Sequence, residues 1–178
     1  KIGFVAYNLG GGSVTVYGGS MMMAIEGLTP KNDYSRAFGV NKTSLSSNTA
    51  HHLMSISNPI VNFNKTNTKE IIIQDISAAA QNNDPIQIML FLDVPLDTGT
   101  HNFSLISESV AAVSQVTGTV DDDAYTPVTE FAMGINGSQQ FELQPYRFVL
   151  PAGSVATLAI KSTSSISRAV VTLVWIAD

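Results

Sequence analysis

The sequence contains no cysteine among its 178 residues, which excludes a disulfide framework, a thiol nucleophile and a cysteine-bound zinc ion. Charged residues are also scarce. They make up 13% of the chain, about half of the usual share of roughly 25%. A surface that is polar but sparsely charged is typical of secreted, cell-surface and capsid proteins.

Basic side chains are too few for a nucleic-acid partner. Nine Lys and Arg stand against 14 Asp and Glu, which gives a net charge of -5, and the nine are scattered singly along the chain. Neither nucleic acid nor an anionic membrane surface is therefore expected as a partner. Apolar runs fall short of the roughly 20 residues that cross a bilayer, so no membrane span is expected in the mature chain.

Sequence motifs of enzymes are missing as well. The chain has no Gly-x-Ser-x-Gly, no phosphate-binding loop and no His-Glu-x-x-His. The glycine run at residues 10–12 lacks the Lys and the following helix that a phosphate loop requires. We therefore expect no enzyme, no catalytic residue and no cofactor.

Three clusters resemble metal ligands, and each has a simpler explanation. Consecutive carboxylates at residues 121–123 rarely converge on one calcium ion, so a solvated loop is expected there. His51 and His52 begin a strand, in which neighbouring side chains point to opposite faces, and His101 is the only other histidine. The Met run at residues 21–23 is expected to pack in a core or an interface. The sequence therefore predicts no metal site.

The dominant pattern is alternation of polar with β-branched and aromatic residues, broken by Gly, Pro, Asn and Asp. It predicts one all-β domain, a jelly-roll-like β-sandwich. Residues 75–81, with three alanines, are the one stretch that could make a turn or two of helix, and residues 107–117 fit a short helix about as well as a strand. Strands are expected at residues 2–9, 13–26, 34–40, 51–57, 70–76, 86–94, 102–107, 130–135, 139–143, 155–162 and 168–176.

The first nine residues are apolar on both faces when extended, unlike an edge strand on a solvated sheet. The side chains that need burial are Ile2, Phe4, Val5, Tyr7 and Leu9. Burying them is worth on the order of 10 kcal/mol before ordering costs. The glycine run that follows consists of Gly10, Gly11 and Gly12.

This segment has two interpretations. It could be the first strand of its own sandwich, with the three glycines as a loop. Alternatively the glycines are a hinge, and the strand completes a second copy of the protein by head-to-tail donor-strand addition, which propagates as a filament. The second interpretation divides the chain into a donor strand with its hinge, residues 1–12, and a β-sandwich, residues 13–178.

Two parts of the chain resemble a known family. The run GGSMMMAIEGLTPKNDYSRAFGVNKTS has a strand ending at Ile25, the turn Leu28-Thr29-Pro30 with Asp33 close behind, and a second strand that closes on Asn41. It resembles the opening of the TasA and camelysin-like biofilm matrix proteins and of the related archaeal bundling pilins. The closing runs FELQPYRFVLPAGSVATLAIKS and SRAVVTLVWIAD are similar to the last strands of that family. Lys31 and Asn32 depart from it, since they stand where Gly precedes Asp.

The resemblance implies a structural subunit of an extracellular fibre at the cell surface, in which the segment after the signal cleavage site is donated to the next subunit. Its expected partners are identical subunits and, in bundles, neighbouring filaments. In that arrangement some of the core aromatic residues would line the groove that receives the strand. Those aromatic residues are Phe131, Phe141, Phe148 and Trp175.

Two rival functions stay open from the sequence. One is a viral coat protein with a single jelly roll, and the other is a monomeric adhesin or carbohydrate-binding sandwich. A glycosylated exterior fits either class or the fibre. The Asn-x-Ser/Thr sequons that make the candidate glycosylation sites are Asn41, Asn64, Asn102 and Asn136.

Overall fold

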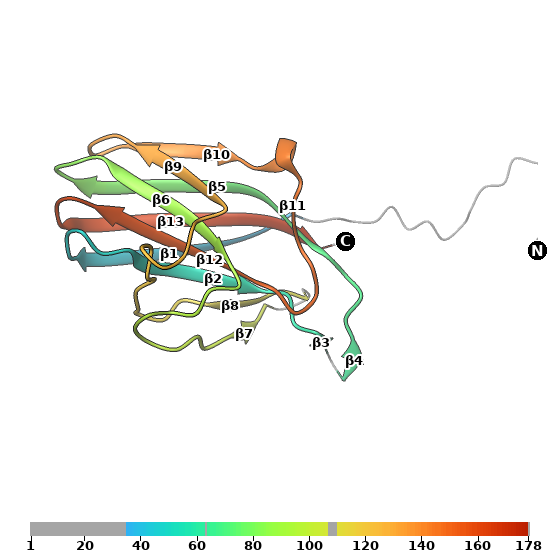
Figure 1. Ribbon diagram of the computed structural model, residues 1–178. Coiled ribbons are helices and arrows are strands. Elements are labelled where there is room, and N and C mark those ends of the chain that lie inside the picture. Colours follow the sequence, from blue (N-terminus) through green and yellow to red (C-terminus); the bar gives the residue numbers. More distant parts are fainter. Residues whose placement is uncertain (1–34, 63, 107–109, 178) are drawn as a thin grey trace, which may run out of the picture. The chain divides into compact units, whose positions relative to one another are not determined.

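The computed structural model describes residues 35–62, 64–106 and 110–177, which form two antiparallel β-sheets packed as a sandwich (Figure 1). The all-β prediction is therefore confirmed. These residues belong to a compact unit, Asp33–Asp178. The predicted domain boundary after Gly12 lies outside the described residues.

The first sheet has five strands. In spatial order it contains β1 (Arg36–Leu45), β13 (Ile166–Ala177), β5 (Ile71–Asn82) and β10 (Ser138–Glu142), and β11 (Phe148–Leu150) also pairs with β5. The 3-10 helix η1 (Gln144–Tyr146) joins β10 to β11. A separate hairpin of β3 (Val61–Asn62) and β4 (Lys65–Thr66) lies at the end of the sandwich where β13 finishes (Figure 1).

The second sheet has six strands. In spatial order they are β7 (Ser104–Leu105), β8 (Ala112–Ser114), β2 (His51–Ser57), β12 (Val155–Ser162), β6 (Ile86–Leu92) and β9 (Thr129–Met133). Leaving out the short β7 and β8, the order β2-β12-β6-β9 faces the order β1-β13-β5-β10 in the first sheet. Each strand thus has its sequence neighbour in the opposite sheet, which is the connectivity of a jelly roll.

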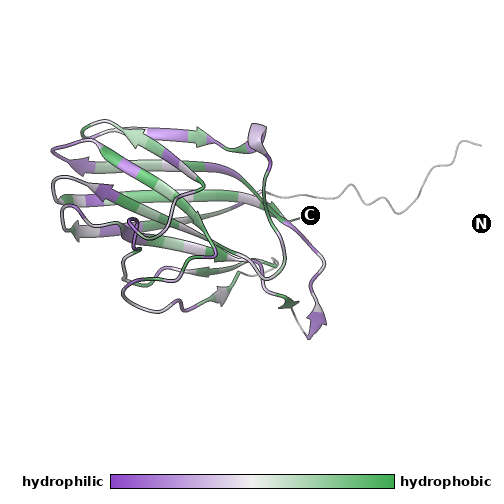
Figure 2. Cartoon of the chain, viewed as in Figure 1, coloured by the Kyte–Doolittle hydropathy of each residue, from purple (hydrophilic) through white to green (hydrophobic). Residues whose placement is uncertain are grey.

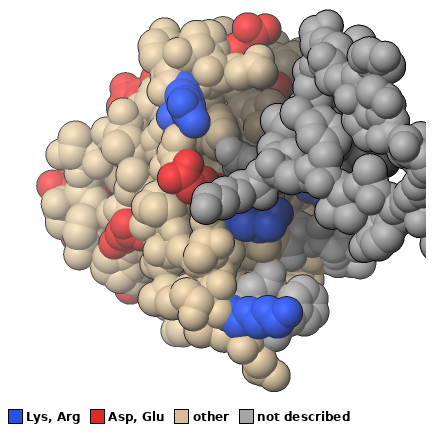
Figure 3. Space-filling view, turned by 90° about the vertical axis from the view of Figure 1, so that its right-hand side faces the viewer, with Lys and Arg blue, Asp and Glu red and all other residues tan. Residues whose placement is uncertain are grey.

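The core lies between the sheets and consists of buried apolar residues from both of them. Hydrophobic residues, green in Figure 2, recur along the strands, and β2, β6 and β12 are buried over most of their length. Trp175 is fully buried in the core, as the sequence predicted. Phe131 and Phe141 stack with ring centroids 4.2 Å apart and close one long edge of the sandwich. On the face seen in Figure 3 the charged side chains stand apart from one another among uncharged ones, as the low charge content of the chain predicts.

A second, smaller apolar cluster covers the outer face of the six-stranded sheet. Met89 and Phe91 of β6 alternate with core residues of the same strand, so they point away from the main core. Val94 and Val120, from the connection between β6 and β9, pack on them. This connection therefore buries β6 on both faces.

The structure corrects the helix expected at residues 75–81. That stretch lies inside β5, which pairs with β13 on one side and β10 on the other. Ala78 and Ala80 are buried in the core. Pairing on both sides outweighs the helix preference of alanine, which is only a few tenths of a kcal/mol over most residues.

Other predicted boundaries also change. Strand β1 continues to Leu45, beyond the predicted end at residue 40, because it pairs with β13 as far as Ile166. The strand predicted at 102–107 is reduced to Ser104–Leu105, and the ambiguous stretch 107–117 contains the strand Ala112–Ser114. The three-residue β11 was missed because it is too short for alternation to be visible.

Candidate functional site

Strand β1 forms an open edge of the first sheet in the described part of the structure. It pairs with β13 along one side, and none of the other described strands pairs with its second side. Phe38 and Val40 of β1 pack against the core, whereas Gly39 and Asn41 between them are exposed. The open side is therefore a row of main-chain groups next to an apolar interior, which is the arrangement that an added strand requires.

A groove of about 500 Å³ lies beside this edge. Phe38 forms one wall, and the opposite wall comes from β7, β8 and the residues next to them. The residues of that opposite wall are Asn102, Ser104, Leu105, Ile106, Val113, Gln115 and Val116. The groove therefore lies between the edges of the two sheets.

The described residues that line the groove are apolar apart from two amides and one hydroxyl, and none of these described side chains is charged. Leu105 is 51% exposed, which is high for a leucine beside a cavity. Among the described residues of the lining there is no base next to a nucleophile and no pair of carboxylates. The lining can bind an extended apolar segment, with side chains in the groove and main chain against β1.

The wall formed by Gln115 and Val116 is held by an unusual pair of donors. The ladder between β2 and β8 ends at Ser55 and Ser114, and pairing resumes where the His52 N–H donates to the Gly118 carbonyl at 2.9 Å. Residues 115–120, here called the edge segment, thus follow β2 with a break in their main-chain pairing at 115–117.

Within that break, side chains donate hydrogen bonds to main-chain carbonyl groups. The Lys42 ammonium, from β1, donates to the Gln115 carbonyl at 2.8 Å and to the Val116 carbonyl at 3.1 Å. His52 Nδ1, from β2, lies 2.8 Å from the same Val116 oxygen. One carbonyl therefore ties the edge segment to both sheets.

His52 is 1% exposed and must be neutral to tolerate this position. Because a carbonyl only accepts, Nδ1 carries the proton, and Nε2 accepts from the Ser55 hydroxyl at 2.9 Å. The Ser55 hydroxyl lies 2.9 Å from that of Thr157 and can accept from it. Burial lowers the pKa of His52 to about 4, against a smaller opposing effect of the Val116 carbonyl, and His101 and Lys42 lower it further.

His101 packs edge-on against His52, with ring centroids 5.6 Å apart, and stacks on Phe103 at 5.1 Å. Both ring nitrogens of His101 are buried and make no hydrogen bond of normal geometry. Burial lowers the pKa of His101, although the nearby Val94 carbonyl favours the protonated form. His51 lies in a different setting: it is half-buried, and its Nε2 lies 3.0 Å from the Ser46 hydroxyl.

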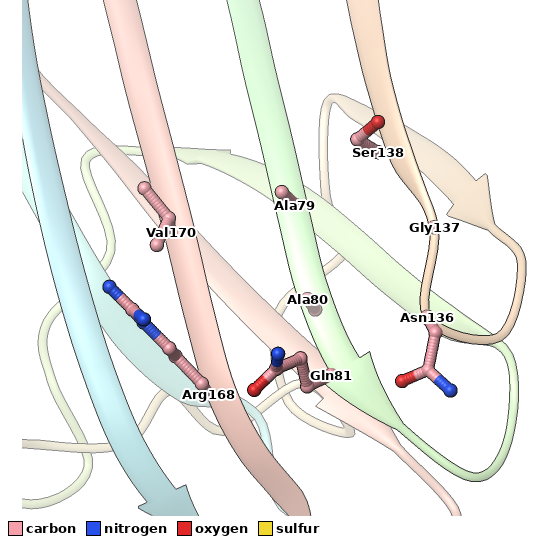
Figure 4. Close-up of a pocket in the computed structure, with 8 residues that line it drawn as sticks. All are labelled: Ala79, Ala80, Gln81, Asn136, Gly137, Ser138, Arg168 and Val170. Atoms are coloured by element: carbon pink, nitrogen blue, oxygen red, sulfur yellow. The ribbon is translucent and has the colours of Figure 1, made fainter.

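A shallow hollow of about 290 Å³ on the outer face of the first sheet is a weaker candidate (Figure 4). Small side chains of β5 and β13 form its floor, and Gln81, Asn136 and Arg168 stand around it. Arg168 Nε donates to the Asn41 side chain at 3.3 Å. With a single cation and no partner for acid-base work, the hollow has no chemistry of its own.

The acidic run at 121–123 is a loop, as predicted. The Asp121 carboxylate accepts from the main-chain N–H groups of Asp123 and Ala124. Asp122 forms an ion pair with Lys161, which raises the pKa of Lys161. Among the described residues, no three His, Asp or Glu side chains are grouped as metal ligands.

The four sequons occupy different settings. Asn41 is on the exposed side of β1, and its side-chain oxygen accepts from Arg168. Asn136 has a positive φ of 46°, and its side-chain oxygen accepts from the Asn82 N–H at 3.0 Å. Asn64 is exposed in the β3–β4 turn, with φ of 61°. Asn102 is exposed beside the groove.

The predicted donor strand and hinge, residues 2–12, lie outside the described residues, as do Met21–Met23. Phe131, Phe141, Phe148 and Trp175 are not among the described residues that line this groove, and the expectation that core aromatic residues receive a donated strand stays a prediction. The aromatic residue of the groove is Phe38. No sequence signal marks the groove, since Phe38, Leu105 and Val116 are distant in the chain and meet only through the jelly-roll connectivity.

Comparison with known proteins gives no family. No family model matches the chain. A search of curated proteins finds no match either. Within the described part, no helix has the length and apolar character needed to cross a membrane.

Proposed function

We propose that the protein is the structural subunit of an extracellular homopolymeric filament, in which residues 2–9 of one copy add to the open edge of β1 in the next copy. The observation that carries this proposal is the uncharged groove of about 500 Å³ beside that edge. Its apolar walls suit a segment that is apolar on both faces. The resemblance to biofilm matrix proteins and bundling pilins supports the same function.

The energetics favour a long-lived joint. A strand that pairs with β1 gains main-chain hydrogen bonds and buries apolar side chains against Phe38, Leu105 and Val113. Residues 1–9 extend to roughly 30 Å, and β1 spans 10 residues, so the two lengths agree. The glycines at 10–12 give the chain the conformational freedom to pass from one subunit to the next.

The first test is electron microscopy of the protein beside a variant that lacks residues 1–9. Thin fibres that vanish with the deletion are expected. Leu105→Arg should also prevent fibres, because it places a charge in the groove while its own position is half exposed. Val128→Arg is the matched control, since Val128 is 52% exposed and is not part of the groove lining.

The outcome that would overturn the proposal is equally clear. Fibres from the truncated chain would show that residues 1–9 are not the joint. Monodisperse particles from the full chain and the truncated chain would place the segment in its own domain.

A second function, a viral coat protein, is favoured by the strand order itself. The two facing sets of four strands, β1-β13-β5-β10 and β2-β12-β6-β9, have the jelly-roll connectivity that viral capsid domains share. The groove could then receive a segment of a neighbouring coat subunit. Closed shells or flat lattices in the same micrographs would support this function over the filament.

A further inference from the structure

The break in pairing at residues 115–117 makes the edge segment depend on side chains. Main-chain hydrogen bonds hold it to β2 where the His52 N–H donates to Gly118 and the Val120 N–H donates to Ala50, both at 2.9 Å. Between these bonds and β8, the carbonyls of Gln115 and Val116 accept from Lys42 and His52. The contact of Lys42 with the Gln115 carbonyl is exposed, whereas both contacts at the Val116 carbonyl are partly buried. Loss of the His52 and Lys42 donors would therefore leave the Val116 carbonyl short of partners, and these donors hold this part of the wall in place.

The groups that face His52 are cationic or neutral. Lys42 approaches from β1 and His101 from the connection after β6. Ser55 of β2 and Thr157 of β12 complete its surroundings and do not titrate at these pH values. The edge segment itself carries no titratable side chain. Of the described residues, no carboxylate acts on His52 to compensate a positive charge.

We propose that His52, His101 and Lys42 form an acid-sensitive latch, which holds the edge segment against both sheets at neutral pH and releases it when the histidines take up protons. Release removes Gln115 and Val116 from the wall of the groove. The latch itself is a property of the single subunit, and only its effect on fibres rests on the proposed function.

The proton enters at a defined atom. In neutral His52, Nε2 is the acceptor of the Ser55 hydroxyl, so an added proton binds there. The Ser55 hydroxyl must then turn, so that it accepts from Nε2–H and donates to the Thr157 hydroxyl. The Thr157 hydroxyl can then no longer donate to Ser55. The hydrogen bonds adjust, but the charge remains buried, facing Lys42 and His101.

The direction of the pH effect follows from the lowered pKa of His52. When the latch is open, His52 titrates at its ordinary value of about 6.5, and when it is closed, at about 4. The closed state is therefore fully favoured above pH 6.5 and loses its advantage as the pH falls from 6.5 to 4. The equilibrium between closed and open should shift by about 100-fold over this range.

Hydrogen exchange on the full chain, corrected for the intrinsic pH dependence of exchange, tests the latch. Protection of the His52 and Val120 amides should fall by about 100-fold between pH 7 and pH 4. Amides in the pairing of β5 with β13 should keep their protection. Equal loss at both places, or constant protection at His52 and Val120, would overturn the proposal.

Variants separate titration from a merely structural role. His52→Gln keeps hydrogen-bonding groups and should lose the pH dependence, and His51→Gln, at the neighbouring half-buried histidine, should keep it. If His52→Gln fails to fold, His101→Phe retains His52, removes one cationic neighbour and should reduce the loss of protection. The same pH profile in His101→Phe and wild type, with His52 still titrating, would contradict the role of His101.

Fibres give a separate measurement. If they form, they should come apart near pH 4 to 5 and hold together better in His101→Phe. Absence of fibres at every pH would remove the proposed function but leave the exchange result intact. Fibres that are stable at pH 4, in a protein whose edge segment opens there, would show that the latch does not control the joint.

Discussion

The two long edges of the sandwich are closed in different ways. At the β9–β10 edge the strands that meet are consecutive in the chain, and Phe131 and Phe141 stack between the sheets. At the β1 edge the meeting parts are more than 70 residues apart, and Lys42 reaches across to the carbonyls of Gln115 and Val116. One edge is thus closed by apolar contact between strands that are consecutive in the chain. The other edge consists of a hydrogen-bonded wall and a groove.

This difference is the reason for placing the proposed joint at the β1 edge. The β9–β10 edge is closed by the short connection between two consecutive strands of opposite sheets and by the aromatic stack, and opening it would disrupt the core between the sheets. The β1 edge leaves main-chain groups unpaired among the described strands and an apolar surface beside them. Added strands bind to edges of this second kind.

The largest effect should come from truncating an aromatic residue at the closed edge. Phe141 is 8% exposed and stacked, so Phe141→Ala should lower the free energy of unfolding by about 3 to 4 kcal/mol. Phe38→Ala at the open edge should cost less than half as much, since Phe38 is only partly buried. Urea denaturation of both variants measures the difference.

The two variants should rank in the opposite order when fibre assembly is measured, with Phe38→Ala the more damaging. Phe38→Ala removes an aromatic wall of the groove, so it should weaken fibres more than its loss of stability explains. Equal losses of stability in the two variants would mean that the two edges are closed to the same degree.

A smaller effect is expected from the residue that bridges the open edge. Lys42→Met keeps the aliphatic stem but removes the donor to two carbonyls, so it should cost about 1 to 2 kcal/mol. The Lys42 side chain is partly buried, and this burial lowers its pKa. Lys42→Arg, with donors retained, is the control in the same denaturation series. No loss in Lys42→Met would mean that the wall is held by main-chain contacts alone.

The sequence predicted the fold class because alternation is a local property. It identified β2 and β12 with their observed bounds and buried Trp175 in the core. It was wrong at residues 75–81, where the alanines favoured a helix locally and the pairing of β5 on both sides decided otherwise.

The candidate site could not be predicted from the sequence. The groove joins Phe38 to residues near 105 and 115, and only the connectivity of the two sheets brings these together. The contact between His52 and His101 was missed for the same reason, although the sequence did place His51 and His52 on opposite faces. Their different surroundings follow from tertiary packing.

The smallest effect should come from an ion pair that takes no part in closing either edge of the sandwich. Lys161 and Asp122 are 26% and 20% exposed, and their pairing attaches the acidic loop to β12. Lys161→Met should cost at most about 1 kcal/mol, because partly exposed ion pairs gain little over their hydration. The loss should shrink in 1 M NaCl, where a partly exposed pair is screened. A loss above 2 kcal/mol that persists in salt would show that the acidic loop depends on this ion pair to stay in place.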